Sequence, residues 1–162
     1  MFTAVLALGS NLGDREKNIS SAVSALGGMG RLMAVSRLYE NPAQGPGGQG
    51  DYLNAAAAID TDLQPSELLE RCMATEASLG RTRPFRDAPR TIDIDIIFFG
   101  DLSMKTESLE IPHPRWRGRD FVITPLLDLR DAGVFSAPEF EMLRLFLSVQ
   151  SRKYEPFHAG LK

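Results

Sequence analysis

Residues 90–99 read Arg90-Thr91-Ile92-Asp93-Ile94-Asp95-Ile96-Ile97-Phe98-Phe99, an apolar and largely β-branched run that predicts a buried β-strand. Side chains alternate between the two faces of a strand. One face is therefore expected to carry Asp93, Asp95, Ile97 and Phe99, and the other Ile92, Ile94, Ile96 and Phe98. Asp93 and Asp95 would stand side by side, about 7 Å apart.

Two carboxylates this close on an apolar strand repel each other and resist burial. A divalent cation resolves both problems, and Mg²⁺ typically takes one or two carboxylates together with substrate phosphates. The segment just upstream, 80–90, contains four arginines, whose guanidinium groups suit phosphate oxygens. The alternative is an edge strand with two solvated aspartates beside a basic loop.

The composition favours a single globular domain over residues 1–150, followed by a polar C-terminal tail, 151–162. The net charge of -3 argues against a general nucleic-acid-binding protein. A single cysteine, Cys72, excludes an internal disulfide framework, and no apolar run approaches the roughly 18 residues of a membrane span. We therefore expect a cytoplasmic protein with no nucleic-acid or membrane partner.

The first part of the chain predicts alternating strands and helices. A strand over 2–8 ends in a glycine-rich turn, and Asp14 is placed to cap the helix that follows and ends at Gly27-Gly28. Strands are expected over 31–40 and 52–59. The glycine- and proline-rich loop between them, 41–51, is interpreted either as a substrate-gating loop or as a merely flexible connection.

The second part predicts a helix that begins near Pro65 and ends at Gly80, before the aspartate strand. The apolar run 121–129 is expected to form a short strand running into a helical turn, and 138–149 an amphipathic helix. The order β-α-β-β-α-β with a C-terminal addition predicts an α+β fold. It is typical of a ferredoxin-like sandwich, in which two helices cover an antiparallel sheet.

Three polar residues in these elements need an interpretation. Glu76 falls inside the apolar stripe of the second predicted helix and is expected to have a partner, unless it reaches water at the margin of the stripe. Cys72 lies in the same stripe and is expected in the core rather than as a nucleophile. His113 lies in a second basic stretch, 111–121, and fits an anion site there. Paired acids, many arginines and a glycine-rich loop together favour phosphoryl-type transfer.

The ordered motifs of the chain resemble those of the 6-hydroxymethyl-7,8-dihydropterin pyrophosphokinases of the folate pathway. The resemblance runs from Ala4 to about Leu127 and includes Glu76. The matching pieces are Leu8-Gly9-Ser10-Asn11-Leu12-Gly13-Asp14, Tyr39-Glu40-Asn41-Pro42, Asp51-Tyr52-Leu53-Asn54-Ala55, Gly80-Arg81-Thr82-Arg83, Ala88-Pro89-Arg90-Thr91-Ile92-Asp93-Ile94-Asp95-Ile96, Ile111-Pro112-His113-Pro114-Arg115 and Arg119-Asp120-Phe121-Val122.

The resemblance implies transfer of diphosphate from ATP to the hydroxymethyl group of 6-hydroxymethyl-7,8-dihydropterin, with release of AMP, by an enzyme that we expect to act as a monomer. It implies two Mg²⁺ ions bound by Asp93 and Asp95. The catalytic positions that it implies are Asp95, Arg81 and Arg90, and the ATP-binding positions are Glu76, Arg81, Arg83, Arg90, Ile96, His113 and Arg119.

The same resemblance implies a pterin site. Its positions are Pro42, Ala43, Gln44, Tyr52, Asn54, Asp93 and Phe121. Tyr52 and Phe121 would sandwich the pterin ring, and Asn54 would read its hydrogen-bonding edge.

Two departures from the family pattern stand out. Asp87 occupies the place of a tryptophan that closes over the pterin in many members, so loop closure and pterin affinity are expected to differ, with Phe85 as a possible substitute. Asn41 stands where threonine is common, and we expect this change to be tolerated because the neighbouring contacts are made by the backbone.

Two other function classes compete with this interpretation. One is a non-catalytic ferredoxin-like module that holds nucleotide or RNA in its basic loops, and bare carboxylates at Asp93 and Asp95 argue against it. The other is a different Mg²⁺-dependent nucleotidyl- or phosphotransferase, which leaves Tyr52, Asn54 and Phe121 unexplained.

Overall fold

The computed structural model describes residues 1–42, 50–80 and 90–157. The elements of the main sheet and its first two helices are β1 (Phe2–Ser10), α1 (Arg15–Leu26), β2 (Arg31–Val35), β3 (Tyr39–Asn41), β4 (Tyr52–Thr61), α2 (Pro65–Ser78) and β5 (Asp93–Phe99). The later elements are β6 (Met104–Lys105), β7 (Glu110–Ile111), the 3-10 turn η1 (Trp116–Gly118), α3 (Asp120–Asp131), the 3-10 turn η2 (Pro138–Phe140) and α4 (Glu141–Ser148).

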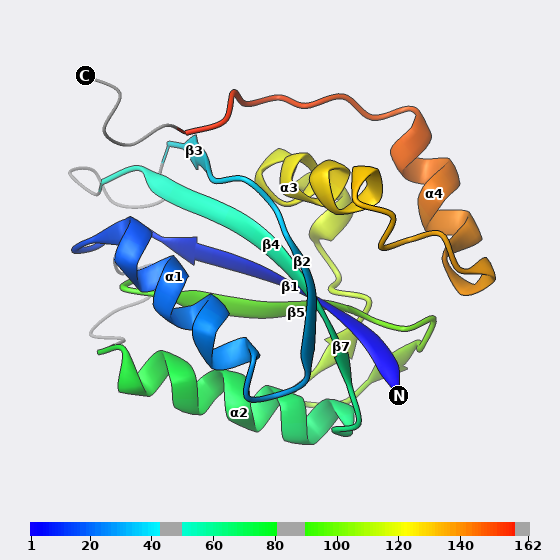
Figure 1. Cartoon of the computed structure of the whole chain (residues 1–162), viewed down its shortest axis with the longest axis horizontal. Helices are drawn as coiled ribbons and strands as arrows, with labels where there is room; N and C mark the ends of the chain where they lie inside the picture. Colours follow the sequence, from blue (N-terminus) through cyan, green and yellow to red (C-terminus); the bar gives the residue numbers. More distant parts are fainter. Residues whose placement is uncertain (43–49, 81–89, 158–162) are drawn as a thin grey trace.

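The main sheet has the strand order β2-β4-β1-β5, and every neighbouring pair is antiparallel. The short strand β3 pairs with β4 beyond the end of β2. Helices α1 and α2 lie on one side of the sheet, and α3 and α4 lie on the other (Figure 1). This order of elements and strands is that of a ferredoxin-like α+β fold, which confirms the sequence-based prediction.

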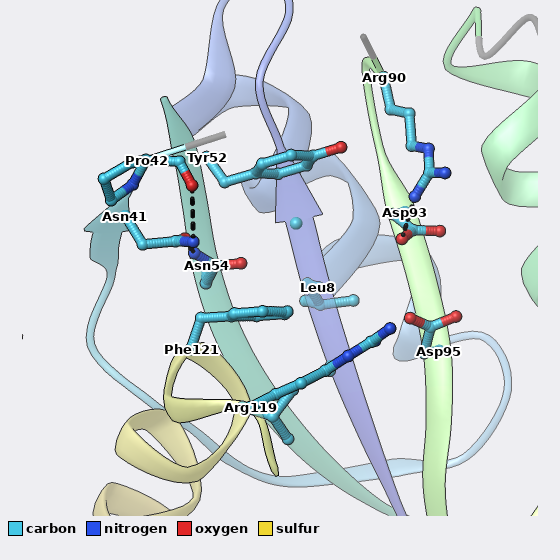
Figure 2. A pocket seen from close by; sticks show the side chains of 13 residues that line it. Leu8, Asn41, Pro42, Tyr52, Asn54, Arg90, Asp93, Asp95, Arg119 and Phe121 are labelled. Atoms are coloured by element: carbon cyan, nitrogen blue, oxygen red, sulfur yellow. Dashed lines mark hydrogen bonds and ion pairs between the residues drawn. The ribbon is translucent and has the colours of Figure 1, made fainter. Parts of the chain in front are cut away.

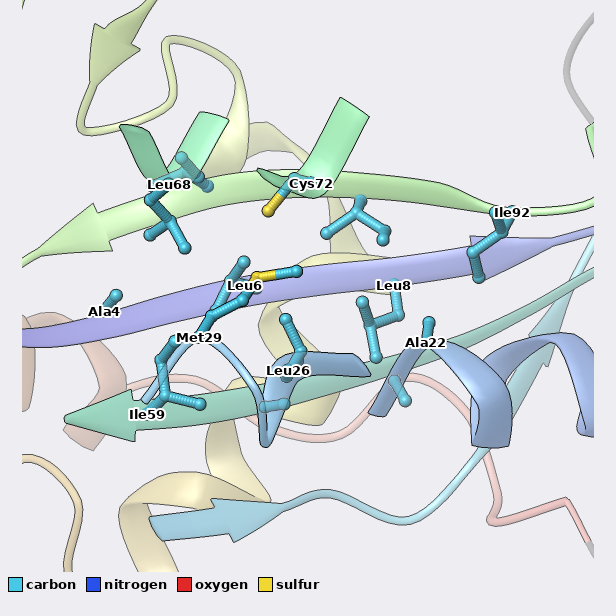
Figure 3. Close-up of a cluster of buried hydrophobic side chains, with 14 of the residues drawn as sticks. Ala4, Leu6, Leu8, Ala22, Leu26, Met29, Ile59, Leu68, Cys72 and Ile92 are labelled. Atoms are coloured by element: carbon cyan, nitrogen blue, oxygen red, sulfur yellow. The ribbon is translucent and has the colours of Figure 1, made fainter. Parts of the chain in front are cut away.

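Two apolar cores form because the central strands bury both faces. The first core lies between the sheet and helices α1 and α2, where Leu6, Leu8, Leu26 and Leu68 pack together (Figure 3). The second lies between the sheet and α3. The alanine run of β4 serves both cores: Ala55 and Ala57 face the first, and Ala56 and Ala58 face the second. Small side chains on this strand let helices approach closely on either side.

Helix α1 begins as the sequence predicts. The carboxylate of Asp14 accepts a hydrogen bond from the backbone N–H of Lys17, 3.1 Å away, which satisfies one of the unpaired donors at the start of the helix. This cap also fixes where the chain leaves the glycine-rich turn after β1.

A β-bulge in β5 overturns the predicted alternation at the end of that strand. Val5 pairs with Phe98 and Leu6 pairs with Ile96, so Ile97 is an extra residue on β5. Ile97 and Phe98 therefore both face the second core, and Phe99 turns to the first. The prediction was wrong for Phe98 and Phe99, because the bulge shifts every side chain after it by one residue.

The predicted strand over 31–40 is in fact two strands, β2 and β3. Ser36 lies between them, and its Oγ accepts the backbone N–H of Ala56 at 2.8 Å. A side-chain oxygen thus replaces a main-chain acceptor, and the regular ladder with β4 stops. The break separates β3, which ends at Asn41, from the outer strand β2.

The apolar run 121–129 belongs to α3, a helix of 12 residues, so the predicted strand there was wrong. Buried side chains occupy almost every position from Val122 to Leu129, because the helix lies between the sheet and the C-terminal region. Such an all-round apolar helix lacks the one-sided periodicity that distinguishes helix from strand. The helix over 138–149 is confirmed as η2 followed by α4.

The first part of the C-terminal tail returns to the domain. The backbone N–H of Phe157 donates to the carbonyl of Leu38 at 2.7 Å, and Tyr39 forms an isolated β-bridge with Pro156. The guanidinium of Arg15 also lies 5.6 Å from the centre of the Phe157 ring. The residues up to 157 are therefore part of the packed structure beside β3.

Asp128 of α3 joins β3 and the C-terminal segment to the helix. Its carboxylate accepts hydrogen bonds from the hydroxyl of Tyr39 at 2.7 Å and from the guanidinium of Arg152 at 2.8 Å, while Arg37 adds a backbone and a side-chain donor. Burial acts to raise the pKa of Asp128, but hydrogen bonds from Arg37, Tyr39 and Arg152 outweigh it and lower the pKa to about 2.

This carboxylate should make the fold sensitive to acid. The ordinary pKa of 3.8 falls to about 2 on folding, so ionised Asp128 stabilises the folded state by about 2 kcal/mol above pH 4. That contribution disappears as the pH falls through 4 towards 2. We expect Asp128→Asn to lower the free energy of unfolding at pH 7 and to flatten its decline in acid, as measured by urea unfolding between pH 7 and pH 3. Asp101→Asn, at an exposed turn, is the control. Parallel pH profiles for wild type and Asp128→Asn would contradict this role.

Candidate active site

A pocket of about 150 Å³ opens on the face of the sheet that carries α3. This volume is far more than a single water molecule needs. The end of β1, the beginnings of β4 and β5, the end of β3 and the first turn of α3 all contribute to its walls (Figure 2). Five segments that lie far apart in the sequence therefore meet at one end of the sheet.

Asp93 and Asp95 both line this pocket, as the alternation along residues 90–95 predicts. Ile94, between them, faces the opposite core. Both aspartates are half-buried, and Asp93 accepts a hydrogen bond from the guanidinium of Arg90 at 3.0 Å. β5 is an edge strand, as the alternative interpretation supposed, but its two aspartates are partly buried rather than fully solvated.

Arg90 is held at the mouth of the pocket through its backbone. Its N–H donates to Oδ1 of Asn11 at 2.7 Å, and its carbonyl accepts the N–H of Asn11 at 3.0 Å. The other side-chain group of Asn11, Nδ2, donates to the carbonyl of Gly50 at 3.3 Å. The turn after β1 is therefore more than a helix cap, because Asn11 ties the backbone of Arg90, which lines the pocket, to the backbone of Gly50.

The charges around the pocket are arranged to hold an anion beside the aspartates. Burial acts to lower the pKa of Arg90, but the negative charges of Asp93 and Asp95 and the hydrogen bond to Asp93 outweigh it, so the pKa is raised and Arg90 stays protonated. Arg119, at the start of α3, extends towards Asp95 from the opposite side (Figure 2).

The pocket has two aromatic walls. Tyr52 at the start of β4 and Phe121 in the first turn of α3 face one another across it, and Asn54 lies between them (Figure 2). The guanidinium of Arg119 lies 5.5 Å from the centre of the Phe121 ring. Gly9 forms the floor, where an added Cβ would lie only 3.4 Å from Oδ1 of Asn54 and 3.5 Å from Cδ1 of Tyr52. A flat ring between the two aromatic side chains is the ligand that this shape suits.

Eight residues predicted for the site come together here. They are Pro42, Tyr52, Asn54, Arg90, Asp93, Asp95, Arg119 and Phe121. The lining residues that sequence reasoning did not assign to the site are Ala7, Leu8, Gly9, Asn41 and Val122. Gly9 and Asn41 lie inside motifs that were recognised, but alternation along a strand does not show which backbone positions approach a ligand.

Four predicted residues, Ala43, Gln44, Arg81 and Arg83, lie outside the described residues, as do Phe85 and Asp87.

Glu76, Ile96 and His113 do not line this pocket. Glu76 of α2 is buried on the other side of β5, where its carboxylate accepts the backbone N–H of Ile94 at 2.7 Å, so its expected partner includes the main chain of the edge strand. Ile96 faces the first core. His113 donates its backbone N–H to the carbonyl of Ile97 at 3.0 Å. Its pKa is lowered, mainly by burial and then by the positive charges of Arg119 and Arg115, so its ring is neutral at pH 7.

The oxygen ligands of the pocket suit a hard cation that is bound by carboxylates and by a substrate phosphate together. No group of three or more histidine, cysteine, aspartate or glutamate side chains that could hold a metal gathers within residues 1–42, 50–80 and 90–157. Two carboxylates without histidine or thiolate match Mg²⁺, which usually keeps places for water and substrate phosphates, better than a structural zinc site.

No helix within the described residues, 1–42, 50–80 and 90–157, is both long enough and apolar enough to cross a membrane.

Paired carboxylates, flanking arginines and an aromatic-walled pocket on a ferredoxin-like sheet are the features expected of a phosphoryl-transferring enzyme of the kinase class. Residues 5–131 match the family model of 7,8-dihydro-6-hydroxymethylpterin-pyrophosphokinase, and the chain belongs to this family. The family transfers a pyrophosphoryl group from ATP to hydroxymethyldihydropterin in folate synthesis.

Curated relatives agree with this membership. The 2-amino-4-hydroxy-6-hydroxymethyldihydropteridine pyrophosphokinase of Bacillus subtilis (strain 168) is 44% identical over 128 residues, which cover 78% of this chain and 77% of that protein. The folic acid synthesis protein FOL1 of Dictyostelium discoideum is 43% identical over 124 residues, but they cover 76% of this chain and only 19% of that protein. This chain thus spans about a fifth of the second relative.

Solved structures agree on the fold. Wild-type HPPK-DHPS of Plasmodium falciparum, crystallised with STZ-DHP, superposes with a TM-score of 0.60 at 15% sequence identity. The match covers 78% of this chain and 39% of that one.

Proposed function

We propose that this chain catalyses the reaction of its family, the transfer of diphosphate from ATP to the hydroxymethyl group of 6-hydroxymethyl-7,8-dihydropterin. The observation that carries the proposal is the position of Asp93 and Asp95. They line the same pocket as the aromatic walls of Tyr52 and Phe121, and the side chains of Arg90 and Arg119 reach them from two different sides. The pocket thus offers a place for a flat heterocycle directly beside a place for phosphates.

The pterin ring is assigned to the space between Tyr52 and Phe121, where both of its faces stack on an aromatic side chain. Asn54 contacts its polar edge, and Pro42 closes the outer side. This orientation directs the hydroxymethyl group towards Asp93 and Asp95 rather than into the apolar cores. Holding the ring in one orientation supplies much of the catalysis, because phosphoryl transfer depends mainly on positioning.

Asp93 and Asp95 would bind Mg²⁺ together with ATP, and two ions are expected. When bound, Mg²⁺ neutralises phosphate charge and aligns the β-phosphorus with the attacking oxygen. Arg90 and Arg119 approach the same region from two sides and stabilise the charge that develops on the leaving phosphate. Family resemblance assigns Glu76, Ile96 and His113 to the nucleotide, Ile96 through its backbone. None of the three lines the pocket, so the nucleotide would extend past the edge strand β5 to meet them.

In the chemical step, the hydroxymethyl oxygen forms a bond to the β-phosphorus and the bond from that phosphorus to the α,β-bridging oxygen breaks. AMP leaves with the bridging oxygen, and the pterin keeps the β- and γ-phosphoryl groups. Asp95 is the group that we assign to the hydroxyl proton, since it lines the pocket beside the expected position of the hydroxymethyl group.

A product analysis tests this function. The protein is incubated with ATP, Mg²⁺ and 6-hydroxymethyl-7,8-dihydropterin, and the nucleotide products are separated by chromatography. Pterin-dependent formation of AMP, in equal amount to pterin diphosphate, is the expected result. Formation of ADP, or turnover that does not depend on the pterin, would refute the proposal.

A further inference from the structure

Two buried asparagines form a hydrogen-bonded pair at the inner end of the pocket. Asn41 ends β3 and Asn54 lies on the neighbouring strand β4, and each is only 5% exposed. Nδ2 of Asn54 donates to Oδ1 of Asn41 and, at 3.4 Å, to the backbone carbonyl of Tyr39. Nδ2 of Asn41 donates to the carbonyl of Pro42 at 3.2 Å (Figure 2).

The two backbone carbonyls decide which way both amides point. A carbonyl oxygen can only accept a hydrogen bond, so Asn41 must turn its Nδ2 to Pro42 and Asn54 must turn its Nδ2 to Tyr39. Asn41 then offers Oδ1 to Asn54, which supplies the donor that this oxygen needs. Reversing either amide would place two acceptors or two donors against each other in a buried site, which is unfavourable because neither group can then be paired.

The orientation of Asn54 determines what the pocket presents to a ligand. With Nδ2 engaged by Asn41 and Tyr39, Oδ1 of Asn54 points to the side of Gly9, where an added Cβ would lie 3.4 Å from it. Figure 2 shows this oxygen directed into the space between Tyr52 and Phe121. The edge of the pocket at Asn54 therefore presents an acceptor.

We propose that Asn41 is a positioning residue for substrate selection, which fixes Asn54 as a hydrogen-bond acceptor and so selects heterocycles that carry an N–H donor at that edge. The inference rests on the proposed function, because the heterocycle is the pterin. A ring that presents an acceptor at the same position is rejected, because its lone pair would face the lone pairs of Oδ1 of Asn54 with no hydrogen between them. In Asn41→Thr, a hydroxyl that can donate and accept replaces the amide. In Asn41→Leu, the side chain keeps the approximate size of asparagine but can neither donate nor accept a hydrogen bond.

A double-mutant cycle tests whether Asn41 acts through Asn54. The fluorescent ligand 6-hydroxymethylpterin is titrated into the protein with Mg²⁺ and α,β-methylene-ATP, in wild type, Asn41→Leu, Asn41→Thr, Asn54→Leu and the double variant Asn41→Leu/Asn54→Leu. We expect Asn41→Leu to raise the Kd of the pterin about tenfold and Asn41→Thr to restore most of the affinity. In the Asn54→Leu background, Asn41→Leu should change the Kd less than about twofold. The affinity for α,β-methylene-ATP should stay unchanged throughout.

The outcomes separate this inference from the proposed function. Equal weakening by Asn41→Leu in both backgrounds, or no weakening in either, overturns the positioning role while wild-type binding still supports the function. A wild-type protein that does not bind 6-hydroxymethylpterin overturns both. If Asn41→Leu unfolds, the Asn41→Thr variant decides, because a tenfold loss of pterin affinity in that folded variant also contradicts the role assigned to the hydroxyl.

Discussion

Replacement of Asp95 by alanine is expected to lower kcat by at least about 10³-fold, which corresponds to about 4 kcal/mol of transition-state stabilisation. Asp95 lines the pocket on a rigid strand that is paired with β1 through Ala7. Its loss removes a ligand for the phosphate-bound cation and the group assigned to the hydroxyl proton. It removes no core contact, because the side chain faces the pocket, so the thermal unfolding midpoint should stay within a few degrees of wild type.

Steady-state formation of AMP, measured beside circular dichroism melting curves, checks this expectation. Asp95→Asn keeps the size of the side chain and should also lose most of kcat, which separates charge from packing. Asp101→Asn removes a carboxylate from an exposed turn just after β5 and should leave kcat unchanged. Wild-type turnover in Asp95→Ala would refute the assignment of this residue.

Removal of either aromatic wall should have the next largest effect, and it should fall on the pterin alone. A base that stacks on an aromatic side chain gains about 1–3 kcal/mol, so Tyr52→Ala or Phe121→Ala should raise the Kd of 6-hydroxymethylpterin about 10- to 100-fold. The affinity for α,β-methylene-ATP should change little, because the nucleotide is assigned to the other side of the aspartates. Isothermal titration of each ligand separates the two effects.

Phe121→Tyr is the matched control for the aromatic wall, since it keeps the ring and adds only a hydroxyl. It should bind the pterin within about threefold of wild type. If Phe121→Ala instead weakened the binding of both ligands equally, the change would reflect damage to the start of α3, where Arg119 is the N-cap residue. That result would contradict the proposal that the pterin binds between the two aromatic side chains, apart from the nucleotide.

The regular elements could be predicted from the sequence because their side-chain periodicity is clear. The alanine run of β4 is the useful example: its helix propensity is high, but turn signals on both sides identify it as a strand, and alternate alanines do face the two cores. The bulge at Ile97 could not be predicted, because an extra residue on one strand is defined only by its pairing with β1. Helix α3 was missed because burial on nearly all sides removes the helical pattern.

The site was predictable to the extent that its residues carry distinctive chemistry. The two aspartates follow from alternation on one strand, whereas the meeting of Tyr52, Asn54 and Phe121 with them follows from family resemblance rather than from any local pattern. Asn11 was missed because its role is to hold the backbones of Arg90 and Gly50, which no spacing in the sequence indicates. Asn41 looked like a neutral replacement, and only the pairing with Asn54 shows what its amide does.

Counting the divalent ions bound beside the nucleotide tests whether Asp93 and Asp95 hold the metal between the two substrates. Wild type and Asp95→Asn are titrated with Mn²⁺ in place of Mg²⁺, in the presence of α,β-methylene-ATP and 6-hydroxymethylpterin, and bound Mn²⁺ is measured by electron paramagnetic resonance. We predict that wild type binds two ions and that Asp95→Asn binds at most one, with weakened affinity. Two ions bound by Asp95→Asn as tightly as by wild type would contradict the metal site.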